Sequence, residues 1–344
     1  MKKLLFLFSV LLSAVGAWAQ GEDMLSTPLT LEAVEAGTIT FNNQAAGSVT
    51  YRVNGGEAQT IESKTKGNIE MKAGDKVALF GDNASYAYYE GVEYVYSNIA
   101  CSADCYIYGN IMSLVSSSNF ATADKLEGKY SFFGLFSYNT YLKNHPSYQL
   151  MLPATTLAES CYSGMFNGCT GLTKAPELPA TTLALECYRS MFAGCTGLTK
   201  APELSATTLA ESCYSGMFNG CTGLTEAPEL PATTLAESCY SGMFIDCTGL
   251  TEAPELPATT LALECYRGMF SGCTGLTEAP ELSATTLAES CYKNMFSGCT
   301  GLTKAPKLPA TTLAESCYSY MFSNCTGLTK APELPATTDR KSVV

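Results

Sequence analysis

The chain is dominated by a 26-residue unit that occurs seven times in direct succession. The first copy occupies residues 152–177 and reads LPATTLAESCYSGMFNGCTGLTKAPE. The six further copies begin at Leu178, Leu204, Leu230, Leu256, Leu282 and Leu308, and an eighth stops after Thr338. A fixed period of this length is typical of a solenoid, in which each unit buries an apolar face against the next.

The first half of each unit predicts an α-helix. In the first copy, Thr156 and Glu159 match the S/T-x-x-E capping box that marks the start of a helix. Leu157, Cys161 and Met165 follow at four-residue intervals, so they would share one apolar helix face.

The helix is expected to end at position 168, and a short strand is expected to follow it. Five copies have Gly at this position and the others have Asp246 and Asn324, all of which tolerate the left-handed conformation that ends a helix. The strand would have about three or four residues, because Pro176 and its equivalents lack a backbone donor. Residues 152–338 are therefore predicted to form an α/β leucine-rich-repeat solenoid, with one helix and one short parallel strand per repeat.

Residues 20–100 have a different pattern, which predicts an antiparallel β-sandwich domain. Short runs of β-branched and aromatic residues alternate with polar ones, and Gly and Asn separate the runs. Near the end of this segment lie five tyrosines, Tyr86, Tyr88, Tyr89, Tyr94 and Tyr96. They are a candidate aromatic patch for a sugar or a protein partner, although tyrosines on strands are commonly half-buried packing residues.

Residues 101–151 are predicted to be an atypical capping repeat. Leu135 and Phe136 align with Met165 and Phe166 at an offset of 30, which is one repeat plus a four-residue insertion around His145. Terminal repeats of solenoids are usually atypical because one of their faces meets solvent or another domain. His145 is therefore expected to be a surface loop histidine.

Both ends of the chain depart from these patterns. Residues 1–19 combine two lysines, a short apolar run and an A-x-A site, which predicts a cleaved signal peptide and a cell-surface, outer membrane-associated or secreted protein with no membrane insertion afterwards. Residues 339–344 abandon the repeat and match the translation of a sequencing-library adapter. We expect a non-native tail on a truncated gene that naturally continues with further repeats.

The repeat motif resembles a known family. The run MF-x-x-C-T-G-L-T followed by a proline-bearing segment is similar to that of the BspA-like leucine-rich repeat surface proteins of anaerobic gut and oral bacteria. The resemblance covers residues 152–338, although this repeat is longer than the family's common form and has Met where Ala is usual before Phe. It implies adhesion to host matrix proteins and to the surfaces of other bacteria.

The cysteines are expected to be buried thiols. Fourteen of the sixteen occur as two per repeat, and across a helix Cys161 and Cys169 would lie about 10–12 Å apart, too far for a bridge. Bridges between neighbouring copies stay open as an alternative. Cys101 and Cys105 match half of a zinc site, but the sequence supplies no second half, so neither a metal nor a cofactor is assigned.

Charged residues form two columns along the repeats. The candidate binding face consists of Lys174, Glu177, Lys200, Glu203, Glu226, Glu229, Glu252, Glu255, Glu278 and Glu281. If strands stack about 4.8 Å apart, the middle copies present six carboxylates in one block. This block would be a solvated acidic face or a site for calcium or a basic protein.

These features favour a non-enzymatic binding protein. A net charge of −12 disfavours nucleic acid as a partner, and no phosphate loop, nucleophile elbow or HExxH motif occurs. We expect protein–protein or cell adhesion through the solenoid face, with host matrix proteins, bacterial surface proteins or glycans as partners. In one alternative the repeats are a stalk that presents a glycan- or protein-binding β domain. A hydrolase in the β domain is a disfavoured third reading.

Overall fold

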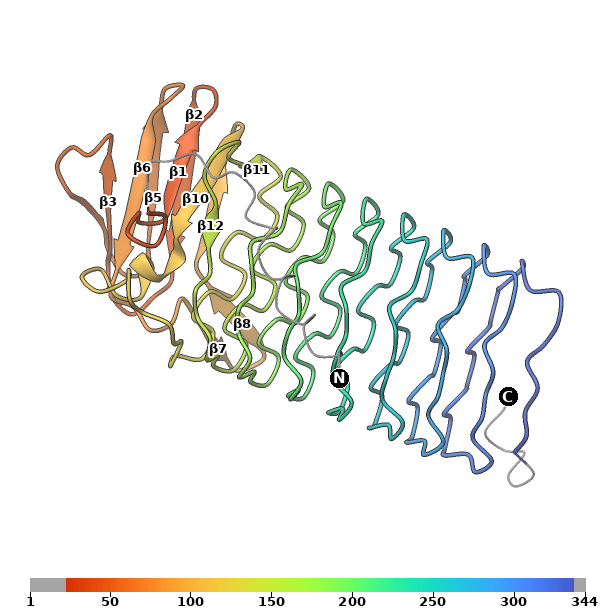
Figure 1. The fold of residues 1–344 in the computed structure, drawn as a ribbon. Helices are drawn as coiled ribbons and strands as arrows, with labels where there is room; N and C mark the ends of the chain where they lie inside the picture. Colours follow the sequence, from red (N-terminus) through yellow and green to blue (C-terminus); the bar gives the residue numbers. More distant parts are fainter. Residues whose placement is uncertain (1–22, 337–344) are drawn as a thin grey trace, which may run out of the picture.

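The computed structural model describes residues 23–336, with a β domain at one end and a row of stacked coils leading away from it (Figure 1). The expected signal peptide and the expected non-native tail lie outside this range. Within it, no helix is long and apolar enough to cross a membrane.

The β domain consists of two sheets and a hairpin around a shared core. The seven-stranded sheet has the order β11-β10-β1-β6-β3-β4, with β12 also paired to β10. Its strands are β1 (Thr30–Ala33), β3 (Val49–Val53), β4 (Gln59–Ile61), β6 (Lys76–Gly81), β10 (Cys105–Asn110), β11 (Leu142–Asn144) and β12 (Leu150–Met151). The three-stranded sheet has β2 (Gly37–Asn43) between β5 (Thr65–Met71) and β9 (Asn98–Cys101). The hairpin pairs β7 (Ala87–Glu90) with β8 (Glu93–Tyr96), and the 3-10 helix η1 covers Ile111–Leu114.

Alternation of buried and partly exposed residues explains why these segments are strands. In β2, Ile39, Phe41 and Asn43 are buried while the residues between them are partly exposed. The seven-stranded sheet extends beyond residue 100, because β10 lies between β1 and β11. Strands β11 and β12 then join β10 in parallel, so the expected sandwich and capping segments share one sheet.

The expected helix in each repeat is wrong: residues 160–169 form a ladder of turns. Alternate N–H groups donate to the next coil, as when Tyr162 N donates to Cys187 O at 2.9 Å and Phe166 N to Met191 O at 2.9 Å. The intervening N–H groups donate three residues back, as when Met165 N donates to Tyr162 O at 3.2 Å. An α-helix would instead pair each N–H with the carbonyl four residues earlier. We call residues 160–169 and their equivalents the turn ladder.

A left-handed residue at every fourth position excludes the helix. The φ angles of Ser160, Gly164 and Gly168 are 50°, 61° and 72°. Each of them is the third residue of a four-residue turn, and a type II turn requires positive φ at this position. A right-handed helix requires negative φ at every residue, so the segment cannot be an α-helix. The left-handed conformation expected at position 168 is therefore present in all seven copies, but it belongs to a repeating turn rather than to a helix end.

The expected parallel strand in each repeat is also wrong. Within residues 152–336 neighbouring coils form only single-residue bridges, such as Thr156 with Thr182 and Lys200 with Glu226. No backbone hydrogen bond joins residues 202–206 to residues 228–232. The prolines in these segments remove donors that a continuous ladder needs.

The interior of the solenoid is a set of stacked identical side chains. Equivalent tyrosines and phenylalanines of successive coils have ring centroids 5.6–5.9 Å apart and planes within 2–8° of each other. Phe136 stacks on Phe166 in the same way, and the N–H of Phe136 donates to Met165 O at 2.9 Å. Residues 130–139, which precede the first full copy, therefore form an additional coil. Each coil therefore gains most of its burial from its neighbours.

Candidate binding surface

The predicted charged columns lie on one exposed face of the solenoid. They flank a segment that contains Pro176 in the first copy and an equivalent proline in each later copy. We call residues 174–180 and their equivalents the Pro–Glu face. The exposed charged residues are Lys174, Glu177, Lys200, Glu203, Glu226, Glu229, Glu252, Glu255, Glu278 and Glu281.

The six middle carboxylates of this face have no salt bridge among the described residues. They are Glu226, Glu229, Glu252, Glu255, Glu278 and Glu281. Within residues 23–336, the one ion pair inside the two columns joins Lys330 to Glu333 at 3.7 Å, at the far end of the solenoid.

Two cavities open between coils on the Pro–Glu face. One of about 540 Å³ is lined by residues of copies two to four, including Glu203, Glu226 and Glu229. The other, of about 320 Å³, lies further along and includes Glu255 and Glu281. Alanines and prolines form much of their remaining lining, so each cavity offers apolar contact beside carboxylates.

This arrangement suits a cationic chain better than a metal ion. Among the described residues, no group of three or more His, Cys, Asp or Glu side chains converges closely enough to hold a metal. Carboxylates beside proline rings can instead accept hydrogen bonds from Lys or Arg side chains. Backbone groups that make no hydrogen bond to the adjacent coil can bond to the backbone of an extended segment.

The five tyrosines of the predicted aromatic patch do not form one surface. Tyr86 is fully buried and donates from its hydroxyl to Leu114 O at 2.8 Å, and burial raises the pKa of this hydroxyl. Tyr88 lies under the Lys64 ammonium at 5.2 Å. Tyr89 and Tyr94 pair across the β7–β8 hairpin, with rings 5.2 Å apart.

The hairpin tyrosines pack against the additional coil. Tyr94 stacks on Phe133 at 4.6 Å and meets Tyr130 edge-on at 5.4 Å, while Tyr96 contacts Phe133 at 5.6 Å. Only Tyr89, at 55%, is more than half exposed. Tyr94 and Tyr96 of the predicted patch therefore join the β domain to the additional coil.

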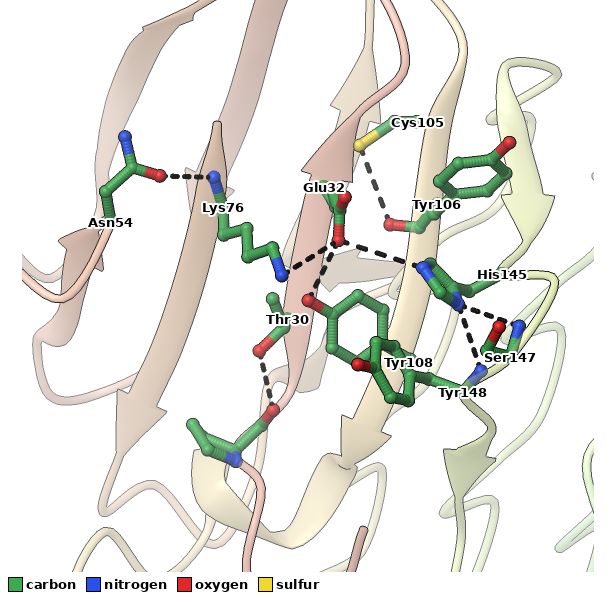
Figure 2. Close-up of polar contacts among 11 residues, drawn as sticks. Thr30, Glu32, Asn54, Lys76, Cys105, Tyr106, Tyr108, His145, Ser147 and Tyr148 are labelled. Atoms are coloured by element: carbon green, nitrogen blue, oxygen red, sulfur yellow. Dashed lines mark hydrogen bonds and ion pairs between the residues drawn. The ribbon is translucent and has the colours of Figure 1, made fainter. Parts of the chain in front are cut away.

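His145 is not an exposed loop residue, because its side chain is only 11% exposed. Figure 2 shows its contacts with Glu32, Ser147 and Tyr148. Nδ1 accepts hydrogen bonds from Ser147 N at 3.0 Å and Tyr148 N at 2.9 Å, which leaves Nε2 facing the Glu32 carboxylate at 3.9 Å. The imidazole stacks on Tyr148 at 4.4 Å. Burial lowers the pKa of His145, and Glu32 acts in the opposite direction.

The β domain also has a cavity, which the sequence did not predict. It has a volume of about 450 Å³ and is lined by Thr50 and Arg52 from β3, by Phe80 from β6, and by Asp82 and Ser117 from loops. Thr50 and Phe80 are register partners in the sheet, so the pairing of β3 with β6 brings these residues together. No local motif could have indicated this site, because its residues come from separate segments.

The cysteines are free thiols, and all except the partly exposed Cys325 are buried. In the turn ladder the second cysteine of each copy donates to a phenylalanine carbonyl of the preceding coil, as Cys169 does to Phe136 O at 3.0 Å. Burial raises the pKa of Cys161 and of Cys169 to about 12. These thiols therefore serve as packing residues.

Searches of family models, characterised proteins and solved structures find no match to this chain. The resemblance to the BspA-like family stays a hypothesis based on the repeat motif alone.

Proposed function

We propose that this protein is a non-catalytic adhesin whose Pro–Glu face binds a protein through an extended segment rich in Lys and Arg. The observation that carries the proposal is the block of six exposed carboxylates, which have no salt-bridge partner within residues 23–336 and lie beside cavities of about 540 and 320 Å³. The resemblance to BspA-like proteins and the predicted signal peptide support a location at the cell surface and host matrix or bacterial surface proteins as partners.

Repetition strengthens such binding without strong individual contacts. Each coil presents nearly the same side chains as the next, so a basic segment can engage several coils at once. The negative electrostatic field of the Pro–Glu face also accelerates association with a basic partner, and added salt screens this field. We therefore expect the affinity to fall as ionic strength rises.

Charge reversal in the full-length chain tests the proposal. The variant Glu226→Lys/Glu252→Lys/Glu278→Lys places in the middle copies the residue that copies one, two, six and seven already carry at this position, so the coil geometry tolerates it. A matched control is Glu211→Lys/Glu237→Lys/Glu289→Lys, which changes the net charge equally at exposed positions outside the Pro–Glu face.

Binding would be measured against a Lys-rich peptide and immobilised matrix proteins, with the fold of each variant checked by circular dichroism. We expect the face variant to lose roughly tenfold or more in affinity and the control to lose far less, because exposed charge pairs contribute up to about 1 kcal/mol each. Equal losses in the two variants would show that net charge alone drives binding and would overturn the proposal.

The β-domain cavity favours a second candidate, in which the repeats are a stalk and the β domain binds a glycan or protein. Phe80 offers an aromatic face, and Arg52 and Asp82 offer groups that can hydrogen-bond to a sugar. In that case Arg52→Ala would abolish binding to immobilised glycans, whereas the charge-reversed Pro–Glu face would leave it intact.

A further inference from the structure

A cavity of about 250 Å³ lies where the Pro–Glu face begins, beside the β domain. One wall is the loop 145–149, which connects β11 to β12, and the other wall is copy one. Strand β10 explains the position of the loop, because Asn144 pairs with Ile107 and Leu150 pairs with Gly109. The chain therefore leaves the sheet after Asn144 and returns to it at Leu150, and the loop protrudes beside copy one.

Hydrogen bonds hold both walls in place. In the loop, His145 Nδ1 accepts from Ser147 N at 3.0 Å and from Tyr148 N at 2.9 Å, and the imidazole stacks on Tyr148 at 4.4 Å (Figure 2). Asn144 joins the two walls, since its Oδ1 accepts from Lys174 N at 2.9 Å and its Nδ2 donates to Lys174 O at 2.9 Å. The cavity is therefore preformed, and a ligand does not have to order it.

The lining of this cavity favours one large apolar side chain as its occupant. Its apolar surface includes Pro146, Leu172, Ala175 and Pro176. The imidazole and the Asn144 amide, which also border the cavity, already form hydrogen bonds within the protein, so they need no polar partner from a ligand. The volume of about 250 Å³ is smaller than the roughly 300–1,000 Å³ of pockets for drug-sized ligands.

The rim of the cavity belongs to the Pro–Glu face. Lys174 and Glu177 border the cavity and are exposed. The equivalent residues of copy two, Lys200 and Glu203, border the cavity of about 540 Å³ that opens further along the same face. A segment bound over the middle carboxylates therefore reaches the smaller cavity by continuing toward the β domain.

We propose that this cavity binds a large apolar side chain, such as Trp or Phe, of the same basic segment that the Pro–Glu face binds. The inference rests on the proposed function, because that segment must first be a partner of the face. The partner then combines a run of Lys or Arg over the middle copies with one apolar residue beside the β domain. In protein interfaces, a few residues that fill preformed pockets carry most of the binding free energy.

The test compares capped peptides that bind the full-length chain, with affinities measured by titration calorimetry. Each peptide has a run of lysines, a glycine spacer and either Trp or Ala at one end, and a second pair has the reverse order so that both directions of binding are covered. We expect the Trp peptide of one order to bind roughly tenfold tighter than its Ala counterpart, because burial of a large apolar side chain supplies at least that factor.

The two proposals fail in different ways. Equal affinities of the Trp and Ala peptides in both orders would overturn this inference and leave the proposed function intact. If none of the peptides binds, the proposed function is wrong, and this inference falls with it.

Variants that fill the cavity locate the apolar side chain. Ala175→Trp places a ring in the cavity from copy one, so this variant should bind the Trp and Ala peptides equally and bind the Ala peptide as the wild type does. Ala305→Trp is the matched control, because Ala305 is the partly exposed equivalent in copy six, and it should keep the tenfold difference. Loss of this difference in both variants, or in neither, contradicts the assignment to this cavity.

A second variant covers the case in which Ala175→Trp does not fold. Ser147 is an exposed residue of the loop and also borders the cavity, so Ser147→Trp fills the cavity without a change in the stacked coils. It should abolish the difference between the Trp and Ala peptides. A folded Ser147→Trp protein that keeps the full difference would place the apolar side chain elsewhere.

Discussion

Two glycine positions in each repeat are glycine for different physical reasons. At position 168 the backbone is left-handed, and two copies satisfy this requirement with Asp246 and Asn324. At position 171 every copy has glycine, because an added Cβ would lie about 2.5 Å from a carbonyl oxygen of the preceding coil. The first position is constrained by conformation and the second by the close approach of two backbones.

Gly249→Ala tests the steric constraint at position 171. Its Cβ would lie 2.5 Å from Thr222 O and 3.1 Å from Leu224 O, so neighbouring coils must move apart. We expect the free energy of unfolding to fall by about 1–3 kcal/mol, measured by urea denaturation. An unchanged midpoint would show that the coils are not in such close contact.

The conformational constraint is tested at Gly220, which has φ of +72° and ordinary van der Waals space around an added Cβ. Gly220→Val should cost about 1–3 kcal/mol of stability, because a β-branched residue is strained in this conformation. Gly220→Asn should cost much less, as Asn324 already occupies the equivalent position. Thermal denaturation of both variants measures the difference, and equal losses would contradict the explanation.

His145 should make stability depend on pH. The groups around it are Glu32 on β1, Lys76 on β6, Tyr106 and Tyr108 on β10, and Tyr148 on its own loop. Because burial lowers its pKa in the folded state, the unfolded chain binds more protons below about pH 6.5. Stability should therefore decrease as the pH falls from about 6.5 toward the folded-state pKa.

The matched variant for this prediction is His145→Asn. An asparagine oxygen can still accept from the backbone N–H groups of Ser147 and Tyr148, as in an Asx-turn, but it does not titrate. Denaturation midpoints measured between about pH 5 and 7 should then depend less on pH than those of the wild type. The same pH dependence in both proteins would assign the effect to other groups.

At the scale of elements, the turn ladder and an α-helix place the same residues in the interior. Cys161, Met165 and Cys169 are buried in the ladder because its period is four residues. Over three turns that period is hard to distinguish from the 3.6 residues of a helix. The left-handed residues provide the distinguishing signal, since Ser160, Gly164 and Gly168 are also spaced by four.

Circular dichroism of the full-length protein tests this correction. A helix in each of seven repeats would give a strong helical signal in the far ultraviolet. We expect a spectrum without helical minima, since in the described part of the chain the only helical element is η1. A strongly helical spectrum would contradict the turn ladder.

At the scale of the whole molecule, one hydrophobic core runs from Leu29, directly before β1, to Met321 in the last copy. A fragment that ends at residue 151 would lose the partners of Phe132 and Phe136, which stack on Tyr162 and Phe166 at 5.6 Å. We expect this fragment to aggregate or to bind a hydrophobic dye, as checked by gel filtration and dye fluorescence. A monomeric, dye-free fragment would show that the β domain is independent.

Deletion of residues 178–255 should have the opposite outcome. The removed block contains three copies, and it places copy one directly before copy five, whose first residues repeat those of copy two. Since each coil contacts only its neighbours, the shortened chain should fold and unfold cooperatively, as measured by urea denaturation. Loss of cooperative unfolding would indicate contacts beyond adjacent coils.

The sequence by itself determined the period, the boundaries of the copies, the buried columns and the exposed charged columns. These follow from residue type and spacing, which any stacked repeat must satisfy. The tertiary structure decided the turn ladder and the burial of His145. Each of these depends on which backbone groups face one another across coils or sheets, and a one-dimensional pattern does not specify that pairing.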